Sequence, residues 1–88
     1  MIDGWLFYIV RCNDGTLYCG ITNNLAERLK KHNGGTGAKY TLGRRPVVLA
    51  YSEECDNISQ ARRREEQVKR WSRIKKEYLI TESIPRSA

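Results

Sequence analysis

Two polar side chains interrupt the apolar face of a stretch with helical spacing. Leu25 and Leu29 define the buried stripe of that stretch. Arg28 and His32, one turn apart, lie on or beside the stripe. Burying a guanidinium or an imidazole costs solvation free energy unless a bound anion or a polar neighbour offsets it. The pair therefore indicates an anion-binding edge, although each residue alone fits a snorkelling arginine or a half-buried, hydrogen-bonded histidine at least as well.

A carboxylate interrupts a second helical stretch in the same way. Three apolar residues mark the inner face of that stretch: Ile58, Ala61 and Val68. Glu65 projects between them, whereas Glu66 lies about 100° further round, toward solvent. A carboxylate among apolar neighbours must be neutralised, paired or bound to a cation. Glu65 is thus a candidate cation ligand, and the alternative is an internal salt bridge to Arg28 or Arg64.

Two tyrosines lie in a predicted β-hairpin, on either side of the turn signal at residues 13–15. If the turn is a three-residue loop with Gly15 in the left-handed conformation, Tyr8 lies opposite Gly20 and Tyr18 falls on the same face. A two-residue loop would put the tyrosines on opposite faces. Because tyrosines in strands more often pack than react, the hairpin becomes informative only together with the helical residues above.

The elements that must position these side chains follow from periodicity and turn residues. In order, we expect strands over 5–10 and 17–21, a helix from 23 or 24 to about 33, a glycine-rich loop over 34–45, a strand over 47–51, a helix over about 58–70 and a shorter helix from 72 to 80. Ile74, Tyr78 and Leu79 should face inward from the last helix.

The element order β-β-α-β-α-α predicts an α/β fold of the α+β type. Its three-stranded, largely antiparallel sheet should carry flanking helices. We expect a single domain over residues 1–82 and a short polar tail over 83–88.

The charge balance indicates a polyanionic partner. The chain has sixteen lysines and arginines and ten acidic residues, which give a formal charge of +6. This excess favours nucleic acid over a membrane surface as the partner. The alternative is a basic surface that serves solubility. No apolar stretch is long enough to cross a bilayer, and the first residues do not form a secretory signal. The three cysteines are widely spaced, which argues against disulfides and a zinc site and favours a reducing, cytoplasmic location.

Together, these residues resemble the motif residues of the GIY-YIG nuclease family. Leu6-Phe7-Tyr8 stands where the family's first tripeptide lies, and Tyr18-Cys19-Gly20 stands for the second. Arg28 follows Gly20 at the family's arginine spacing, and His32-Asn33 comes one turn later. Glu65 lies in a segment similar to the family's carboxylate helix. The likeness spans Trp5 to Lys69 and is closest to small standalone bacterial members. Leu6, Phe7 and Cys19 depart from the usual tripeptides but leave both tyrosines in place.

The resemblance implies a fold, a reaction and a set of roles. Glu65 would hold one Mg²⁺ or Mn²⁺, and Arg28 would clamp a phosphate. Tyr18 would act as general base or orient the attacking water, with Tyr8 supporting or sharing that role. His32 would take a proton from a tyrosine or position a phosphate oxygen. Gly20 and Asn33 would shape the site.

A second set of basic residues lies on the glycine-rich loop. Lys39, Arg44 and Arg45 are expected to contact the nucleic-acid backbone, with a flexible connector as the alternative. The pocket residues occur without an evident sequence-reading element, which favours structure-selective cleavage, with DNA expected ahead of RNA. The chain also resembles the nuclease domain of the eukaryotic branched-DNA endonuclease, and the family resemblance implies a role in repair or recombination. The competing hypotheses are a non-catalytic basic binding module and a subunit that needs a protein partner for activity.

Overall fold

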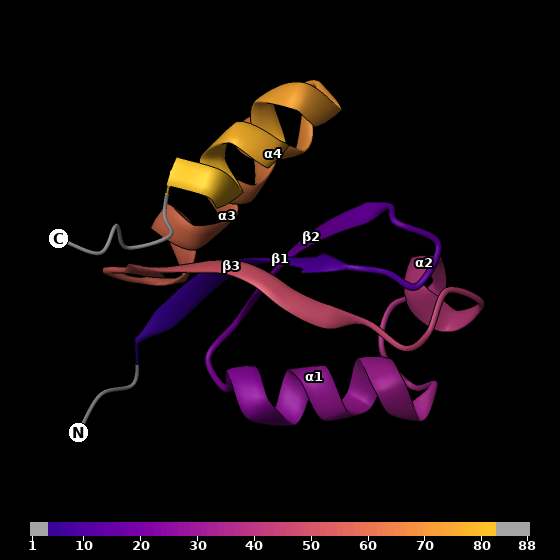
Figure 1. The fold of residues 1–88 in the computed structure, drawn as a ribbon. Helices are drawn as coiled ribbons and strands as arrows, with labels where there is room; N and C mark the ends of the chain where they lie inside the picture. The colour runs from indigo at the N-terminus through magenta and orange to yellow at the C-terminus, as the bar shows by residue number, and fades with distance from the viewer. Residues whose placement is uncertain (1–3, 83–88) are drawn as a thin grey trace, which may run out of the picture.

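A computed structural model describes residues 4–82 and places three antiparallel strands at the centre of the fold (Figure 1). The sheet order is β2-β1-β3, with β1 at Trp5–Arg11, β2 at Leu17–Thr22 and β3 at Val48–Cys55. Strand β1 is central because its side chains are apolar on both faces, as a strand covered on both sides requires. The expected three-stranded antiparallel sheet is confirmed.

Helices cover both faces of the sheet (Figure 1). On one face, α3 (Ile58–Lys69) and α4 (Arg73–Glu82) pack over a cluster that contains Phe7 and Ile9 of β1. On the other face, α1 (Leu25–Gly34) packs over Tyr8 and Val10 of the same strand. Alternate residues of β1 therefore supply two separate cores, and Tyr8 belongs to the face that α1 covers.

The hairpin has the three-residue loop that puts both tyrosines on one face. Gly15 adopts a left-handed backbone conformation with φ 86°, and the Cys12 amide donates to the Thr16 carbonyl oxygen at 2.8 Å. Tyr8 lies opposite Gly20 and Val10 opposite Tyr18. Both phenols consequently project toward α1, because residues at even spacing share a face of a strand.

Asparagine caps fix the starts of the two main helices. The side chain of Asn24 accepts from the Glu27 amide at the start of α1, and Asn57 accepts from the Gln60 amide at the start of α3. Gly35, with φ 88°, ends α1 in the left-handed conformation that glycine tolerates best. These caps set the phase of each helix and hence the direction of its polar side chains.

Three expectations need correction. The segment expected as a loop contains a short helix, α2 (Lys39–Leu42), so the order is β-β-α-α-β-α-α. Strand β3 begins one residue later than expected and continues to Cys55 because it pairs along the whole of β1. Ile74 and Tyr78 are 82% and 65% exposed, since Leu79 and Ile80 form the buried side of α4.

Three further observations complete the fold. All three cysteines are buried and free. No helix within residues 4–82 has the length and apolar character needed to span a membrane. The predicted tail, 83–88, lies outside the described residues.

An ion pair joins α4 to the central strand and should make the stability of the fold depend on pH in the acid range. Both oxygens of Glu77 accept from Arg11, at 2.7 and 2.9 Å, and this hydrogen bonding lowers the pKa of Glu77 from 4.5 to about 2. Because the pKa of Glu77 is lower in the folded state than in the unfolded state, the ionised carboxylate stabilises the fold at pH values above 4.5. This contribution to the free energy of unfolding is lost as the pH falls from 4.5 toward 2. Urea midpoints at about pH 7 and about pH 3 should therefore differ less in Glu77→Gln than in the wild type.

The matched control for this prediction is Glu66→Gln. Glu66 pairs with Arg70 only across exposed surface, where an ion pair contributes little. We expect its pH dependence to equal that of the wild type. Identical pH dependence in Glu77→Gln and the wild type would contradict the assigned role of the Arg11 pair.

Candidate active site

The hydroxyl of Tyr8 is the centre of a buried polar cluster. Tyr8 is fully buried, and its Oη lies 2.9 Å from Nε2 of His32. Arg28 donates its Nε proton to the same oxygen at 3.3 Å. Burial raises the pKa of Tyr8 above its ordinary value, and Arg28 opposes that rise. The phenol is therefore neutral near pH 7 and already held between an imidazole and a guanidinium.

Gly20 creates the space for that hydroxyl. A Cβ at this position would lie 2.5 Å from Oη of Tyr8 and 2.6 Å from Cζ, closer than any real side-chain contact. Since both atoms belong to a rigid phenol ring, the ring would have to move. The expectation that Gly20 shapes the site thus has a physical basis in the cross-strand pair that it forms with Tyr8.

We expect Gly20→Ala to lower the free energy of unfolding by about 1–3 kcal/mol, because overpacking displaces the Tyr8 ring. Gly34→Ala is the matched control. Its Cβ would meet nothing within 4 Å, and alanine in a helix should leave stability equal or raise it by about 0.5–1 kcal/mol. Urea denaturation of both variants checks this, and equal stability of Gly20→Ala and the wild type would contradict it.

His32 is fully buried and bonded through both ring nitrogens. Its Nδ1 lies 2.9 Å from Oγ1 of Thr41 in α2, and its Nε2 faces Tyr8. Gly37 packs directly on the ring, where a Cβ would lie 2.6 Å from Nδ1. Burial first, and then the nearby Arg28 charge, lower the pKa of His32. The imidazole is consequently neutral at pH 7.

Tyr18 occupies the more accessible side of the same cluster. Its ring packs edge-on against His32 with centroids 5.5 Å apart and stacks on Tyr40 at 5.6 Å. Its partial exposure contrasts with the full burial of Tyr8. Hydrogen bonding to Tyr8, joined by the proximity of Tyr18, raises the pKa of Arg28. The guanidinium thus lies beside both phenols and remains charged.

Glu65 lies on α3, which packs on the face of the sheet opposite the tyrosine cluster. This helix contacts both β1 and β2, and the side chain of Glu65 is half-buried. After burial, the Glu65 carboxylate is among the charges that raise the pKa of Tyr8, and it acts on Cys19 in the same direction. The carboxylate is thus a minor influence on the pKa of Tyr8. Its membership of the site stays a prediction, because no hydrogen bond or ion pair within residues 4–82 joins it to the cluster.

The salt bridge that offered an alternative explanation for Glu65 does not form. Arg64 pairs instead with Glu53 at 2.8 Å, and Arg28 bonds to Tyr8. Within residues 4–82, Glu65 has no hydrogen bond or ion pair, whereas its neighbour Glu66 pairs with Arg70. A half-buried carboxylate without a protein cation is a suitable ligand for a metal ion.

A single-carboxylate site fits Mg²⁺ or Mn²⁺ better than zinc. Over residues 4–82, no group of three or more histidine, cysteine or acidic side chains could hold a metal. Zinc sites in proteins normally use three or four such ligands. Mg²⁺ keeps several waters and often takes only one or two carboxylates. The donor set therefore fits a hydrated divalent cation on Glu65.

The basic residues of the loop have different environments. Lys39 is exposed. Arg44 pairs with Asp14 at 2.9 Å and lies 4.0 Å from the centroid of the Tyr40 ring. Arg45 donates to the carbonyl oxygens of Leu42 and Asn33. Contacts of these three bases with nucleic acid stay a prediction, and two of them already hold the loop together.

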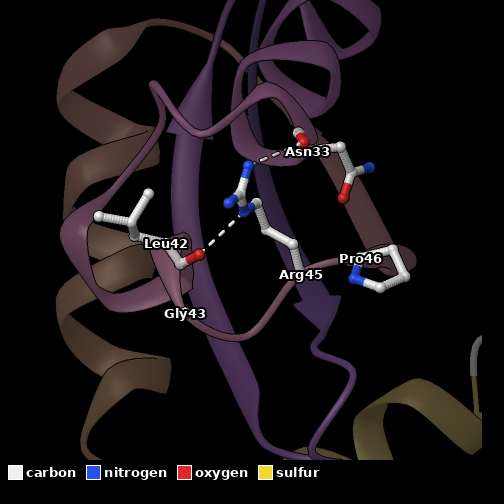
Figure 2. A pocket seen from close by; sticks show the side chains of 5 residues that line it. All are labelled: Asn33, Leu42, Gly43, Arg45 and Pro46. Carbon is white, nitrogen blue, oxygen red and sulfur yellow. Dashed lines mark hydrogen bonds between the residues drawn. The ribbon is translucent and has the colours of Figure 1, made fainter.

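Figure 2 shows the pocket that Arg45 crosses, a volume of about 400 Å³ lined by five residues: Asn33, Leu42, Gly43, Arg45 and Pro46. It lies at the end of α1, and neither Tyr8 nor Tyr18 lines it. The amide of Asn33 also exchanges hydrogen bonds with the backbone of Val47, at 2.7 and 3.1 Å. Asn33 thus joins α1 to the start of β3, a structural role.

Sequence reasoning missed Thr41, Tyr40 and Gly37 as parts of this cluster. All three lie in the segment that we expected to be a loop, and α2 brings them onto His32 and Tyr18. The glycines of that segment gave only a loop signal. Periodicity could not have placed them, because a four-residue helix has too few turns to show a pattern.

Comparison with known proteins agrees with this fold. The sequence profile described as the GIY-YIG catalytic domain matches residues 4–78, so the chain belongs to the GIY-YIG family. Members of this family typically use a divalent cation, and the domain implies a nucleic-acid substrate and a nuclease reaction.

Within the family, the chain is similar to small proteins called UPF0213. It is 49% identical over 81 residues to UPF0213 protein SSP2268 of Staphylococcus saprophyticus, covering 92% of this chain and 99% of that one. The NMR structure of UPF0213 protein BH0048 from Bacillus halodurans is 41% identical, with a TM-score of 0.60 and coverage of 91% and 85%. The NMR structure of EF2693 from E. faecalis is 36% identical, with a TM-score of 0.63 and coverage of 99% and 94%.

Proposed function

We propose that this protein is a metal-dependent endonuclease that hydrolyses nucleic-acid phosphodiester bonds, selective for DNA structure rather than sequence. One observation carries the proposal. Four residues from two strands and a helix meet in one cluster: Tyr8, Tyr18, Arg28 and His32. Glu65 on α3 adds a half-buried carboxylate that has no cationic partner within residues 4–82. Phosphodiester hydrolysis needs these functions together: neutralisation of phosphate charge, a positioned water and a proton acceptor.

Glu65 is the residue that would hold one Mg²⁺ or Mn²⁺. When bound, the cation would neutralise phosphate charge and stabilise the leaving oxygen. A single carboxylate gives weak affinity without substrate, because most of the shell must come from water and phosphate. Cleavage should accordingly need free cation in excess of the protein.

Arg28 would clamp the phosphate. Its Nε proton is donated to Tyr8, which orients the guanidinium and leaves the terminal nitrogens for phosphate oxygens. A guanidinium forms two parallel hydrogen bonds with such a group. The same charge favours the ionised form of the Tyr8 phenol.

Tyr18 would orient the attacking water or take its proton, with Tyr8 in support. Tyr18 is partly exposed, so a water can reach its hydroxyl. Tyr8 is fully buried, and its hydroxyl is shared by His32 and Arg28. In this division of roles, His32 takes a proton from Tyr8 when Tyr8 ionises.

The proposed substrate is branched, flapped or single-stranded DNA. The net charge of +6 supports contacts to a phosphate backbone, and Lys39, Arg44 and Arg45 would provide some of them. The described elements include no helix or strand that projects from the fold to read base edges. Selectivity would then come from the shape of the nucleic acid.

The experiment is a cleavage assay of the purified protein on a panel of labelled substrates. The panel includes plain duplex, flapped, branched and single-stranded DNA, with matched RNA, in Mg²⁺, in Mn²⁺ and with a chelator. We expect metal-dependent nicking of the branched or single-stranded DNA and slower nicking of the duplex. Salt-dependent binding without metal-dependent nicking would overturn the proposal in favour of a binding module.

One observation favours a second candidate, a subunit that a protein partner directs. Ile74 and Tyr78 are exposed and one turn apart on α4, a spacing that places them on one face. If they dock a partner, the isolated protein should cleave slowly without selectivity. Substituting both with serine should then leave cleavage by the isolated protein unchanged.

A further inference from the structure

His32 is the only histidine of the chain, and its second ring nitrogen has a partner that the proposed chemistry does not use. Nδ1 lies 2.9 Å from Oγ1 of Thr41, on the side of the ring away from Tyr8. Thr41 is 1% exposed. Its hydroxyl also lies 2.9 Å from the carbonyl oxygen of Ala38. A buried chain of hydrogen bonds therefore runs from Ala38 through Thr41 and His32 to Tyr8.

The direction of this chain follows from which atoms can donate. The Ala38 carbonyl oxygen can only accept, so Thr41 donates its single hydroxyl proton to it. The Thr41 oxygen therefore accepts a hydrogen bond, and the donor is the N–H group at Nδ1 of His32. Because the buried imidazole is neutral, this is the only proton on its two ring nitrogens.

The remaining proton positions follow from that tautomer. Nε2 of His32 has a free lone pair, and the Tyr8 hydroxyl donates to it. The Tyr8 oxygen in turn accepts from Nε of Arg28. The opposite tautomer would turn the Thr41 proton away from Ala38 and make one hydrogen bond fewer, which is unfavourable in a buried network.

We propose that Thr41 is a positioning residue that fixes the tautomer of His32, so that Nε2 always faces Tyr8 as a proton acceptor. Thr41 lies in α2, and Gly37, just before that helix, packs so closely on the ring that no side chain would fit there. Among the described residues, the titratable or charged groups recorded beside the imidazole are the phenols of Tyr8 and Tyr18 and the cation of Arg28. The positive charge of Arg28 disfavours a protonated ring.

The consequence for reactivity rests on the proposed function. When Tyr8 ionises, its O–H bond breaks and a new N–H bond forms at Nε2, which gives a phenolate and an imidazolium. The Nε–H group of Arg28 stays on the phenolate oxygen. Nδ1 keeps its proton and its bond to Thr41, so no other atom needs to move. Without Thr41, a fraction of the imidazole would present a proton to Tyr8 and could accept none.

The test is a long-range ¹H–¹⁵N correlation spectrum of the ¹⁵N-labelled protein, in which one histidine gives an unambiguous signal. We expect the wild type to carry its proton on Nδ1. Thr41→Val, which keeps the shape and removes the hydroxyl, should show a mixture of both tautomers. Thr41→Ser keeps the hydroxyl and should match the wild type. A proton on Nε2 in the wild type, or an unchanged tautomer in Thr41→Val, would overturn the proposal.

Cleavage rates separate this inference from the proposed function. Thr41→Val should cleave about tenfold more slowly, the loss expected for one hydrogen bond, and Thr41→Ser within about twofold of the wild type. Equal rates for Thr41→Val and the wild type would contradict the positioning role. If the wild type does not cleave, the proposed function fails, and the spectrum still decides the tautomer. If Thr41→Val does not fold, the tautomer of His32 is assigned from the spectra of the wild type and Thr41→Ser.

Discussion

Replacing Glu65 with glutamine should lower the rate of metal-dependent cleavage by at least about a hundredfold. Glutamine keeps the size and half-buried position of the side chain and removes only the charge. Within residues 4–82, Glu65 has no cationic partner, so the substitution breaks no ion pair and should not lower stability. The measurement is the single-turnover nicking rate as a function of Mn²⁺ concentration, with folding checked by urea denaturation.

The adjacent residue provides the control. Glu66→Gln removes the same charge from the same helix, one residue along, where the carboxylate is exposed and paired with Arg70. We expect its cleavage rate and Mn²⁺ dependence to match those of the wild type. If both variants lose activity equally, the effect is one of net charge, and Glu65 is not a metal ligand.

Tyr18→Phe should have the second large effect, a loss of about 10²–10⁴-fold in rate. The phenylalanine keeps the ring contacts with His32 and Tyr40 and removes only the hydroxyl that would orient or deprotonate water. The affinity for DNA should change little, because Arg28 and the loop bases remain. The measurement pairs single-turnover rates with DNA-binding titrations in a chelator.

Tyr51→Phe is the matched control for that variant. Tyr51 is also partly buried in a strand, but it packs in the cluster on the opposite face of the sheet and its hydroxyl bonds to Glu53. Its cleavage rate should equal that of the wild type. A Tyr18→Phe protein as fast as Tyr51→Phe would rule out Tyr18 as the water-orienting group.

The sequence narrowed the β-sheet side of the site to two registers, one for each turn length, and the structure has the three-residue loop. Gly15 tolerates the left-handed conformation that a three-residue loop needs. That loop puts Tyr8 opposite Gly20 and turns Tyr18 to the same face. Helical spacing likewise placed Arg28 and His32 on the α1 surface that faces these tyrosines.

The parts that could not be predicted depend on tertiary packing. A four-residue helix leaves no periodic signal, so the contact of Thr41 with His32 could not be foreseen. The apolar pattern of α4 suggested that Ile74 and Tyr78 are buried, yet the helix turns Leu79 and Ile80 inward. The position of Glu65 likewise depends on how α3 packs against β1 and β2, which no local pattern specifies.

A double-variant comparison tests most directly whether the phenol and the carboxylate serve one reaction. Single-turnover rates are measured for the wild type, Tyr18→Phe, Glu65→Gln and the protein with both changes. Groups that act as a unit are strongly non-additive. We predict that the double variant is no slower than the slower single variant. Two independent losses that multiply, or equal cleavage by all four proteins, would contradict a single active site built from Tyr18 and Glu65.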